Sequence, residues 1–290
     1  MAAPVLVTPT APRLNNVLFT TDFSEESLKA LPFAGGIARA CGSKLHLLHI
    51  EPSAPLSAGL ADTHLYESAG KNAAQQLAAL RGVPEIKGLD PALVLAEGGI
   101  KGEFLKTISD RHIDLAVAGT RGRTGVRKML LGSVLEEMCR TATCPMMTVG
   151  PEAAFISEAP FKKILFPTNM SELSKKAVPY IALLAKKYGS QITVLHVVPQ
   201  DEAMTSDAKA LGESVRNRMA SSFGPALAEF QPEFEVAFGA TADAVLRIAR
   251  EKKVDLVAMA IRNAFRPGIL RQRTAYRIMA GAPCPVLTVP

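Results

Sequence analysis

One stretch of the sequence decides the fold: Ala116-Val-Ala-Gly119-Thr-Arg-Gly122-Arg-Thr-Gly-Val-Arg-Lys-Met-Leu-Leu-Gly132-Ser133-Val134-Leu-Glu-Glu. Its apolar beginning predicts a buried strand over residues 115–118, and Gly132-Ser133 predicts the start of a helix that continues to about residue 140. A basic, glycine-rich loop lies between them. A strand, such a loop and a helix N-terminus capped by Ser133 form an anion site, because free N–H groups and the positive end of the helix dipole face the ligand. The stretch therefore favours a cradle for nucleotide phosphates.

The spacing of the glycines separates this loop from commoner phosphate loops. The Gly-x-x-x-x-Gly-Lys-Ser/Thr pattern of P-loop enzymes is absent, and Gly119, Gly122 and Gly125 do not match the Gly-x-Gly-x-x-Gly dinucleotide fingerprint. What matches is Gly-x2-Gly-x9-Gly-Ser, at Gly119, Gly122, Gly132 and Ser133. This pattern resembles the ATP-binding motif of the universal stress protein family. The alternative interpretation is that the glycines only shape a tight turn and that Ser133 is an ordinary helix cap.

The composition is that of an α/β protein with room for two domains. The chain has 290 residues, of which 48% are hydrophobic. A chain of this length can divide into two domains that each bury a core. The net charge is +6, but aromatic residues make up only 6% and tryptophan is absent. Because nucleic-acid binding favours a concentrated basic face with aromatic stacking, we expect no nucleic-acid partner.

The cysteines and the apolar runs indicate a compartment. Cys41, Cys139, Cys144 and Cys284 show no Cys-x-x-Cys spacing and no neighbouring pair of histidines, which favours buried thiols in a reducing compartment over a metal site. No apolar run reaches the ~20 residues of a membrane span. Residues 1–14 are expected to form a loose tail. We therefore expect a cytoplasmic protein without a membrane partner or a bound structural metal.

An internal repeat divides the chain. Asn16–Ser24 recurs as Lys163–Ser171, and Cys144-Pro145 recurs as Cys284-Pro285. Such self-similarity indicates two homologous copies, which we assign to residues 15–150 and 161–290, joined by a linker over residues 151–160.

Each copy alternates short apolar strands with helices. In the first copy we expect helices over residues 24–40, 66–81, 101–112 and 133–140, with an exposed loop over residues 52–64. The strands expected in the two copies cover residues 17–20, 45–50, 92–97, 114–118 and 146–149, then 164–166, 192–197, 233–236, 256–260 and 286–289. This alternation predicts βαβ units and a parallel sheet.

The family resemblance covers nearly all of both copies and implies a fold. Besides the glycine motif it rests on Thr-Asp-Phe-Ser at residues 21–24, Leu-Leu-His-Ile at 47–50 and Cys-Pro-x-x-x-Val at 144–149. It implies two tandem five-stranded parallel sheets in the order 3-2-1-4-5, with helices on both faces. An exposed last strand is a liability, so we expect residues 146–149 and 286–289 to pair with each other. Strands one and four would border a crevice at their carboxyl ends.

The resemblance also implies which residues meet the nucleotide. Thr20, Thr21, Asp22 and Ile50 would border the adenine and ribose, although the family usually has proline where this chain has Thr20. For Asp22 alone a turn residue, and for Ile50 alone a core residue, would be the ordinary interpretation.

The phosphate end would come from the opposite wall. Ala118 and Gly119 would meet the ribose and α-phosphate. The remaining contacts would be donors to the phosphates and come from Arg121, Gly122, Gly132, Ser133 and Val134. The implied cofactor is ATP, with ADP, AMP and an accompanying Mg²⁺ left open. We assign no catalytic residue.

The second copy departs from the motif. Ala260, Asn263, Arg273 and Thr274 stand where the first copy has its glycines and Ser133, and Asn169 replaces the aspartate. We therefore expect that this copy does not bind ATP in the family manner. Its arginines form either a solvated face or a site for another anion or an acidic partner, and they are Arg262, Arg266, Arg271, Arg273 and Arg277.

The favoured function that follows is a tandem stress protein, which binds ATP in its first half and acts as a nucleotide-dependent switch or adaptor towards a protein partner not identified by the sequence. The alternatives are a slow ATP hydrolase and a nucleotide-independent dimerisation or interaction module. Association of two chains into a homodimer also stays open.

Overall fold

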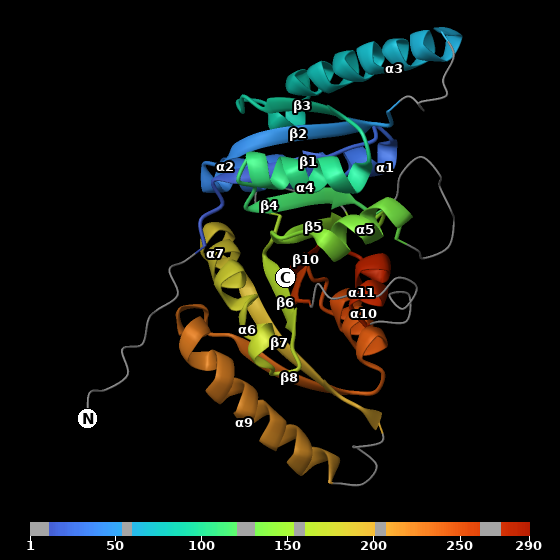
Figure 1. Ribbon diagram of the computed structural model, residues 1–290. Helices are drawn as coiled ribbons and strands as arrows, with labels where there is room; N and C mark the ends of the chain where they lie inside the picture. Colours follow the sequence, from blue (N-terminus) through green and yellow to red (C-terminus); the bar gives the residue numbers. More distant parts are fainter. Residues whose placement is uncertain (1–11, 54–59, 121–130, 154–159, 201–206, 262–273) are drawn as a thin grey trace, which may run out of the picture.

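A single sheet organises the whole chain (Figure 1). The structure is a computed structural model that describes residues 12–53, 60–120, 131–153, 160–200, 207–261 and 274–290. Within these residues the strands form one 10-stranded sheet in the order β3-β2-β1-β4-β5-β10-β9-β6-β7-β8. The order 3-2-1-4-5 predicted for each copy is confirmed, and in both halves it runs from the outer end of the sheet towards the centre.

The strands agree closely with the predicted ones. Those of the first half are β1 (Asn16–Thr20), β2 (Lys44–Glu51), β3 (Ala92–Glu97), β4 (Leu115–Gly119) and β5 (Met146–Val149). Those of the second half are β6 (Lys163–Pro167), β7 (Gln191–Val198), β8 (Glu233–Phe238), β9 (Leu256–Ala260) and β10 (Val286–Val289). Within each half the described pairs are parallel.

The halves join where β5 and β10 pair antiparallel, as predicted, with Leu287 opposite Met147. Two buried threonine hydroxyls reinforce the seam. Thr148 Oγ1 donates to the Val286 carbonyl at 3.4 Å, and Thr288 Oγ1 donates to the Met146 carbonyl at 3.2 Å. Each edge strand therefore covers the other, which removes the exposed edges that separate halves would carry.

Helices cover both faces of the sheet. The first half contributes α1 (Glu25–Leu28), α2 (Leu31–Cys41), α3 (Leu60–Ala79), α4 (Ile100–Asp110) and α5 (Ser133–Thr141). The second half contributes α6 (Glu172–Lys175), α7 (Val178–Tyr188), α9 (Ala208–Leu227), α10 (Thr241–Glu251) and α11 (Thr274–Gly281). The outlying helices α3 and α9 lie at opposite ends of the molecule (Figure 1).

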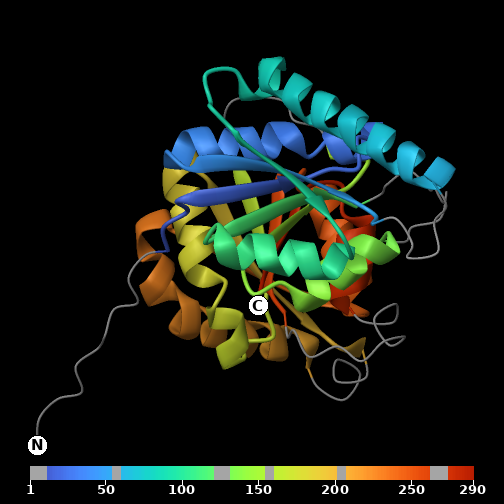
Figure 2. The same ribbon diagram turned by 45° about the horizontal axis from the view of Figure 1, so that its top comes forward.

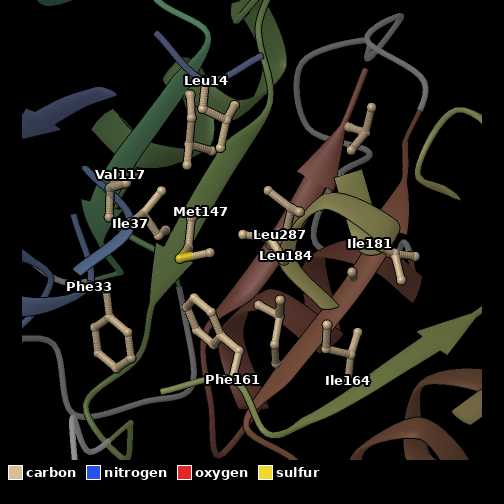
Figure 3. Packing of buried hydrophobic residues seen from close by; sticks show 14 of the residues in the cluster. Leu14, Phe33, Ile37, Val117, Met147, Phe161, Ile164, Ile181, Leu184 and Leu287 are labelled. Carbon is tan, nitrogen blue, oxygen red and sulfur yellow. The ribbon is translucent and has the colours of Figure 1, made fainter. Parts of the chain in front are cut away.

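Two apolar clusters, one on each face of the sheet, both cross the seam. One combines residues of α2 with residues of α7 and α9, and the other combines α4 and α5 with α10 and α11. In the first cluster Phe33 and Phe161 stack with ring centroids 6.0 Å apart (Figure 3). Leu14, which we expected in the loose tail, is buried in the same cluster. The two halves therefore share their cores. In the turned view the first half comes forward over part of the second (Figure 2).

Two helix predictions were wrong in detail. The helix expected over residues 24–40 is two helices, α1 and α2, and the same break separates α6 from α7. A proline stands in the first turn of each second helix, Pro32 in α2 and Pro179 in α7, where its missing N–H costs least. The loop expected over residues 52–64 ends earlier, because α3 already begins at Leu60.

Candidate functional site

A cavity of about 310 Å³ opens at the carboxyl ends of β1 and β4. In an open parallel sheet this is the switch point where connections leave in opposite directions. Arg121 and Gly122 lie outside the described residues. Every other residue predicted for the site lines this cavity: Thr20, Thr21, Asp22, Ile50, Ala118, Gly119, Gly132, Ser133 and Val134.

Several lining residues were missed by the sequence analysis. Apolar side chains come from Leu48 on β2, Ile100 at the start of α4, and Leu135 and Met138 on α5. Polar ones are Ser27, His49 and Thr120. Thr120 follows directly on Gly119 in sequence, so adjacency to the motif was a usable signal. Ile100 carried no such signal, because only the packing of α4 beside the crevice brings it there.

The turn after β1 is fixed by its own hydroxyls and carboxylate. Thr21 Oγ1 accepts from the Phe23 N–H at 2.8 Å and bonds Ser27 Oγ at 2.9 Å. Asp22 Oδ1 accepts from the N–H and the hydroxyl of Ser24, at 3.0 and 2.6 Å. Ser24 in turn caps α1 by accepting from the Ser27 N–H. The carboxylate of Asp22 is thus held at the cavity by the residues that start α1.

His49 is anchored from both ring nitrogens. Nδ1 lies 2.7 Å from the Thr21 carbonyl, and Nε2 lies 2.9 Å from the Glu51 carboxylate. A carbonyl only accepts, so Nδ1 donates to it. The ring also packs on Phe23 with centroids 4.3 Å apart. In the second half His196 makes the matching bond to the Thr168 carbonyl at 2.8 Å, in line with the structural role expected for both histidines.

The start of α5 differs from the prediction. The N-cap is Gly132, not Ser133, and no side chain caps the helix. The Gly132 N–H bonds the Thr120 carbonyl at 3.1 Å, and the Gly132 carbonyl accepts from Glu136 N–H as the first helical bond. Ser133 and Val134 are exposed. The first N–H groups of a helix have no intrahelical partner, so this end presents donors at the rim of the cavity.

Glycine is present at the two ends of the motif, Gly119 and Gly132, for different structural reasons. A Cβ on Gly119 would lie 2.7 Å from the Glu26 carbonyl oxygen and 2.8 Å from Ser27 Cα, so β4 needs glycine there to pass beside α1. A Cβ on Gly132 would meet only the Thr120 carbonyl oxygen, at 3.9 Å. Gly119 is therefore required by packing, and Gly132 leaves open space where the cavity begins.

The second half keeps the turn but not the motif. Asn169 Oδ1 accepts from Ser171 and Ser174 much as Asp22 accepts from Ser24. Arg277, which we grouped with the basic loop, lies on α11 and pairs with Asp243. The other arginines of that group, and Asn263, lie outside the described residues.

Comparison with known proteins decides the family. The model of the universal stress protein family matches residues 14–150 and again residues 160–290. This chain belongs to the universal stress protein family. It is a tandem member, since the family model matches twice.

Relatives and solved structures agree with that assignment. Universal stress protein YxiE of Bacillus subtilis is 28% identical over 145 residues, which are 47% of this chain and 98% of the relative. A universal stress protein of Methanocaldococcus jannaschii is 27% identical over 46% of this chain and 80% of its own length. The solved structure of a universal stress protein from Archaeoglobus fulgidus has the same fold over 96% of both chains, with 21% identity and a TM-score of 0.73.

Two further findings concern metals and membranes. Among the residues that the structure describes, no group of three or more His, Cys, Asp or Glu side chains is placed to hold a metal ion. In the same residues, no helix combines the length and the apolar character needed to cross a membrane.

Proposed function

We propose that the cavity of the first half binds an adenine nucleotide, with ATP as the expected ligand and ADP and AMP as alternatives. One observation carries the proposal: residues far apart in sequence line one cavity beside a helix N-terminus that no side chain caps. The role of each lining residue is part of the same proposal.

The chemistry of the cavity suits the parts of such a ligand. Leu48, Ile50, Ile100 and Met138 offer apolar surface for the flat face of a base. Asp22 offers a carboxylate that accepts from ribose hydroxyls. Backbone N–H groups at Gly132–Val134 suit phosphate oxygens, because the helix end supplies both donors and a positive dipole end.

The hydrogen bonds of the titratable side chains favour nucleotide binding over nucleotide hydrolysis. Among the described lining residues, these are Asp22 and His49. Both nitrogens of His49 are bonded within the protein, and Asp22 Oδ1 holds the α1 cap. A general base must accept a proton from the attacking water, and these bonds already occupy both nitrogens of His49 and one oxygen of Asp22. We therefore place slow hydrolysis second, behind a nucleotide-loaded switch or adaptor in the stress response.

The compartment and the assembly belong to the same proposal. Cys41, Cys139, Cys144 and Cys284 are all free thiols, which supports the reducing cytoplasm. We also propose that two chains associate into a homodimer, which sedimentation tests. An acidic protein partner is a further proposal, which a pull-down experiment tests.

The test is nucleotide stoichiometry with a matched set of variants. Protein purified without added nucleotide is denatured and its released nucleotides are identified. ATP is then titrated by calorimetry with and without Mg²⁺. We expect about one site per chain, lost in Gly132→Arg, which places in the first half the residue found in the second. Gly132→Ala is the control, since its Cβ would meet only the Thr120 carbonyl oxygen, at 3.9 Å, and should leave the fold intact.

A second pair of variants separates binding from folding. Asp22→Asn keeps the turn, because Asn169 accepts from the N–H and hydroxyl of Ser171 in the second half as Asp22 accepts from those of Ser24. It should weaken ATP binding at unchanged stability, whereas Asn169→Asp should leave the stoichiometry unchanged. Two sites per chain would contradict the expectation that the second half does not bind ATP. No binding at millimolar ATP would favour the nucleotide-independent interaction module.

A further inference from the structure

A tyrosine of the second half bonds the backbone of the first half beside the cavity. The Leu131 N–H donates to Tyr276 Oη at 3.1 Å, between residues 145 apart in sequence. Tyr276 lies on α11 and is 2% exposed, and Leu131 is 4% exposed. Burying a phenol hydroxyl and a backbone N–H is unfavourable unless they are bonded, so this contact is specific in a way that apolar packing is not.

The bonded N–H belongs to the residue immediately before the α5 cap. Gly132 N–H is bonded to the Thr120 carbonyl, and Thr120 N–H is bonded to the Val149 carbonyl at 2.9 Å. These two bonds hold the approach to α5 to the first half's own sheet. The bond to Tyr276 holds the same approach from the other half. The start of α5 is therefore fixed against both halves of the molecule.

The contact between the halves is one-sided within the described residues, since the second half supplies the tyrosine and the first half supplies the backbone N–H. Leu131, Leu135 and Met138 belong to the same apolar cluster as Tyr276 and Ile278, which joins the two halves on this face of the sheet. The sequence of α5, Ser-Val-Leu-Glu-Glu-Met-Cys-Arg-Thr, contains no tyrosine that would return the contact to the second half. The half that has lost the nucleotide motif supplies the hydroxyl, and the half that keeps the motif receives it.

We propose that Tyr276 is a positioning residue for the phosphate end of the first half's site. This inference rests on the proposed function. By holding Leu131, the second half fixes the N–H groups of Gly132–Val134 before a ligand arrives, which lowers the ordering cost of phosphate binding. The degenerate half thereby has a role in the binding of nucleotide by its neighbour.

If Tyr276 positions the phosphate end of the site, its loss should affect ligands with phosphates and spare ligands without them. Tyr276→Phe keeps the ring in the apolar cluster and removes the hydroxyl. Phosphate-bearing ligands should bind more weakly by about three- to tenfold, the range expected when one neutral hydrogen bond is lost. Adenosine, which lacks the phosphates, should keep its affinity. A merely structural role would weaken all ligands together or none.

The experiment uses the full chain. Dissociation constants for adenosine, AMP and ATP are measured by calorimetry for the native protein, Tyr276→Phe and Tyr188→Phe, with urea unfolding alongside. Tyr188 is the matched control, because it is a buried tyrosine of the second half whose hydroxyl has no hydrogen-bond partner in the described structure. Equal affinities for ATP in the native protein and Tyr276→Phe, or a loss equal for ATP and adenosine, would overturn the inference.

A ligand-free measurement separates this inference from the proposed function. Amide hydrogen exchange at residues 131–135 should be faster in Tyr276→Phe than in the native protein and in Tyr188→Phe. Unchanged exchange would overturn the positioning role. If exchange accelerates but the native protein binds no adenine nucleotide, the contact fixes α5 as inferred, and the proposed function fails.

Discussion

Gly119 shows how one residue serves packing and site together. It lines the cavity, yet the atoms a side chain would strike belong to the backbone of α1. Backbone atoms cannot rotate away as a flexible side chain can, so any added Cβ must push the strand and the helix apart.

We predict that Gly119→Ala destabilises the fold by about 1–3 kcal/mol, the usual cost of overpacking a core. Gly102→Ala is the control, because a Cβ there meets nothing within 4 Å inside α4. That control should be neutral or stabilising by up to about 1 kcal/mol, since alanine favours helix over glycine. Urea unfolding measures both. Equal stability of Gly119→Ala and the native protein would show that α1 can move aside.

The buried thiols predict a pH dependence. Burial raises the pKa of Cys139, Cys144 and Cys284 to about 12, from an ordinary value of 9.0. The folded state therefore holds these protons more tightly than the unfolded chain. Their contribution to stability is complete below pH 9 and is lost as the pH rises from there towards 12.

The measurement is urea unfolding at pH 8, 9.5 and 10.5, with thiol labelling at pH 8. We expect the stability to fall across the series, and a Cys139→Ala, Cys144→Ala, Cys284→Ala variant to show a shallower fall. Cys41 is only partly buried and should be labelled first, with the other three labelled on unfolding. Rapid labelling of all four thiols in the folded protein would contradict the burial.

At the scale of elements, α1 and α6 begin with the same kind of serine N-cap. Ser24 and Ser171 each accept from the N–H three residues on, at the start of a short helix. Short helices depend strongly on such caps, since few internal bonds support them. In the first half the capping serine is also held by Asp22, so the cap and the cavity share a residue.

We predict that Ser24→Ala costs about 0.5–2 kcal/mol of stability, the range for the loss of an N-cap. Ser221→Ala is the comparison, because that exposed hydroxyl only bonds the Asn217 carbonyl within α9. Ser24→Ala should also weaken nucleotide binding by releasing Asp22. Urea unfolding and calorimetry give the two effects separately. A stability loss as small as that of Ser221→Ala would contradict the cap.

At the scale of the molecule, the seam makes two copies into one folding unit. Both apolar clusters contain residues of both halves, and the sheet is continuous through β5 and β10. A half on its own would expose the edge of its last strand and one side of each cluster. Such surfaces drive association.

We predict that residues 1–150 alone form a homodimer through β5, in place of the missing β10. Met147 would then lie opposite Met147 of a second copy, where it now lies opposite Leu287. Sedimentation measures the mass, and Met147→Lys should abolish the dimer by placing a charge in the seam. A stably folded monomer of residues 1–150 would contradict the shared cores.

Much of this architecture was open to prediction because it depends on local pattern. The positions of the strands follow from the alternating apolar runs, and the two copies follow from the duplicated sequence. The order of the strands was implied by the resemblance to the family. The convergence of Thr20 and Ala118 was predictable too, since carboxyl ends of neighbouring parallel strands meet at one edge. The break between α1 and α2 was missed, although Pro32 was a signal for it in the sequence. No proline or capping residue was used to predict the early start of α3 at Leu60.

The sequence by itself determined that this chain is a doubled universal stress protein with its motif intact in the first half only. The tertiary structure alone decided why Gly119 must be glycine, why His49 and Ile100 border the cavity, and that Tyr276 supports Leu131. Each of these depends on atoms that approach across a sheet or a seam. Periodicity and spacing record which face a residue occupies, whereas the partner it meets there is fixed only when distant elements pack.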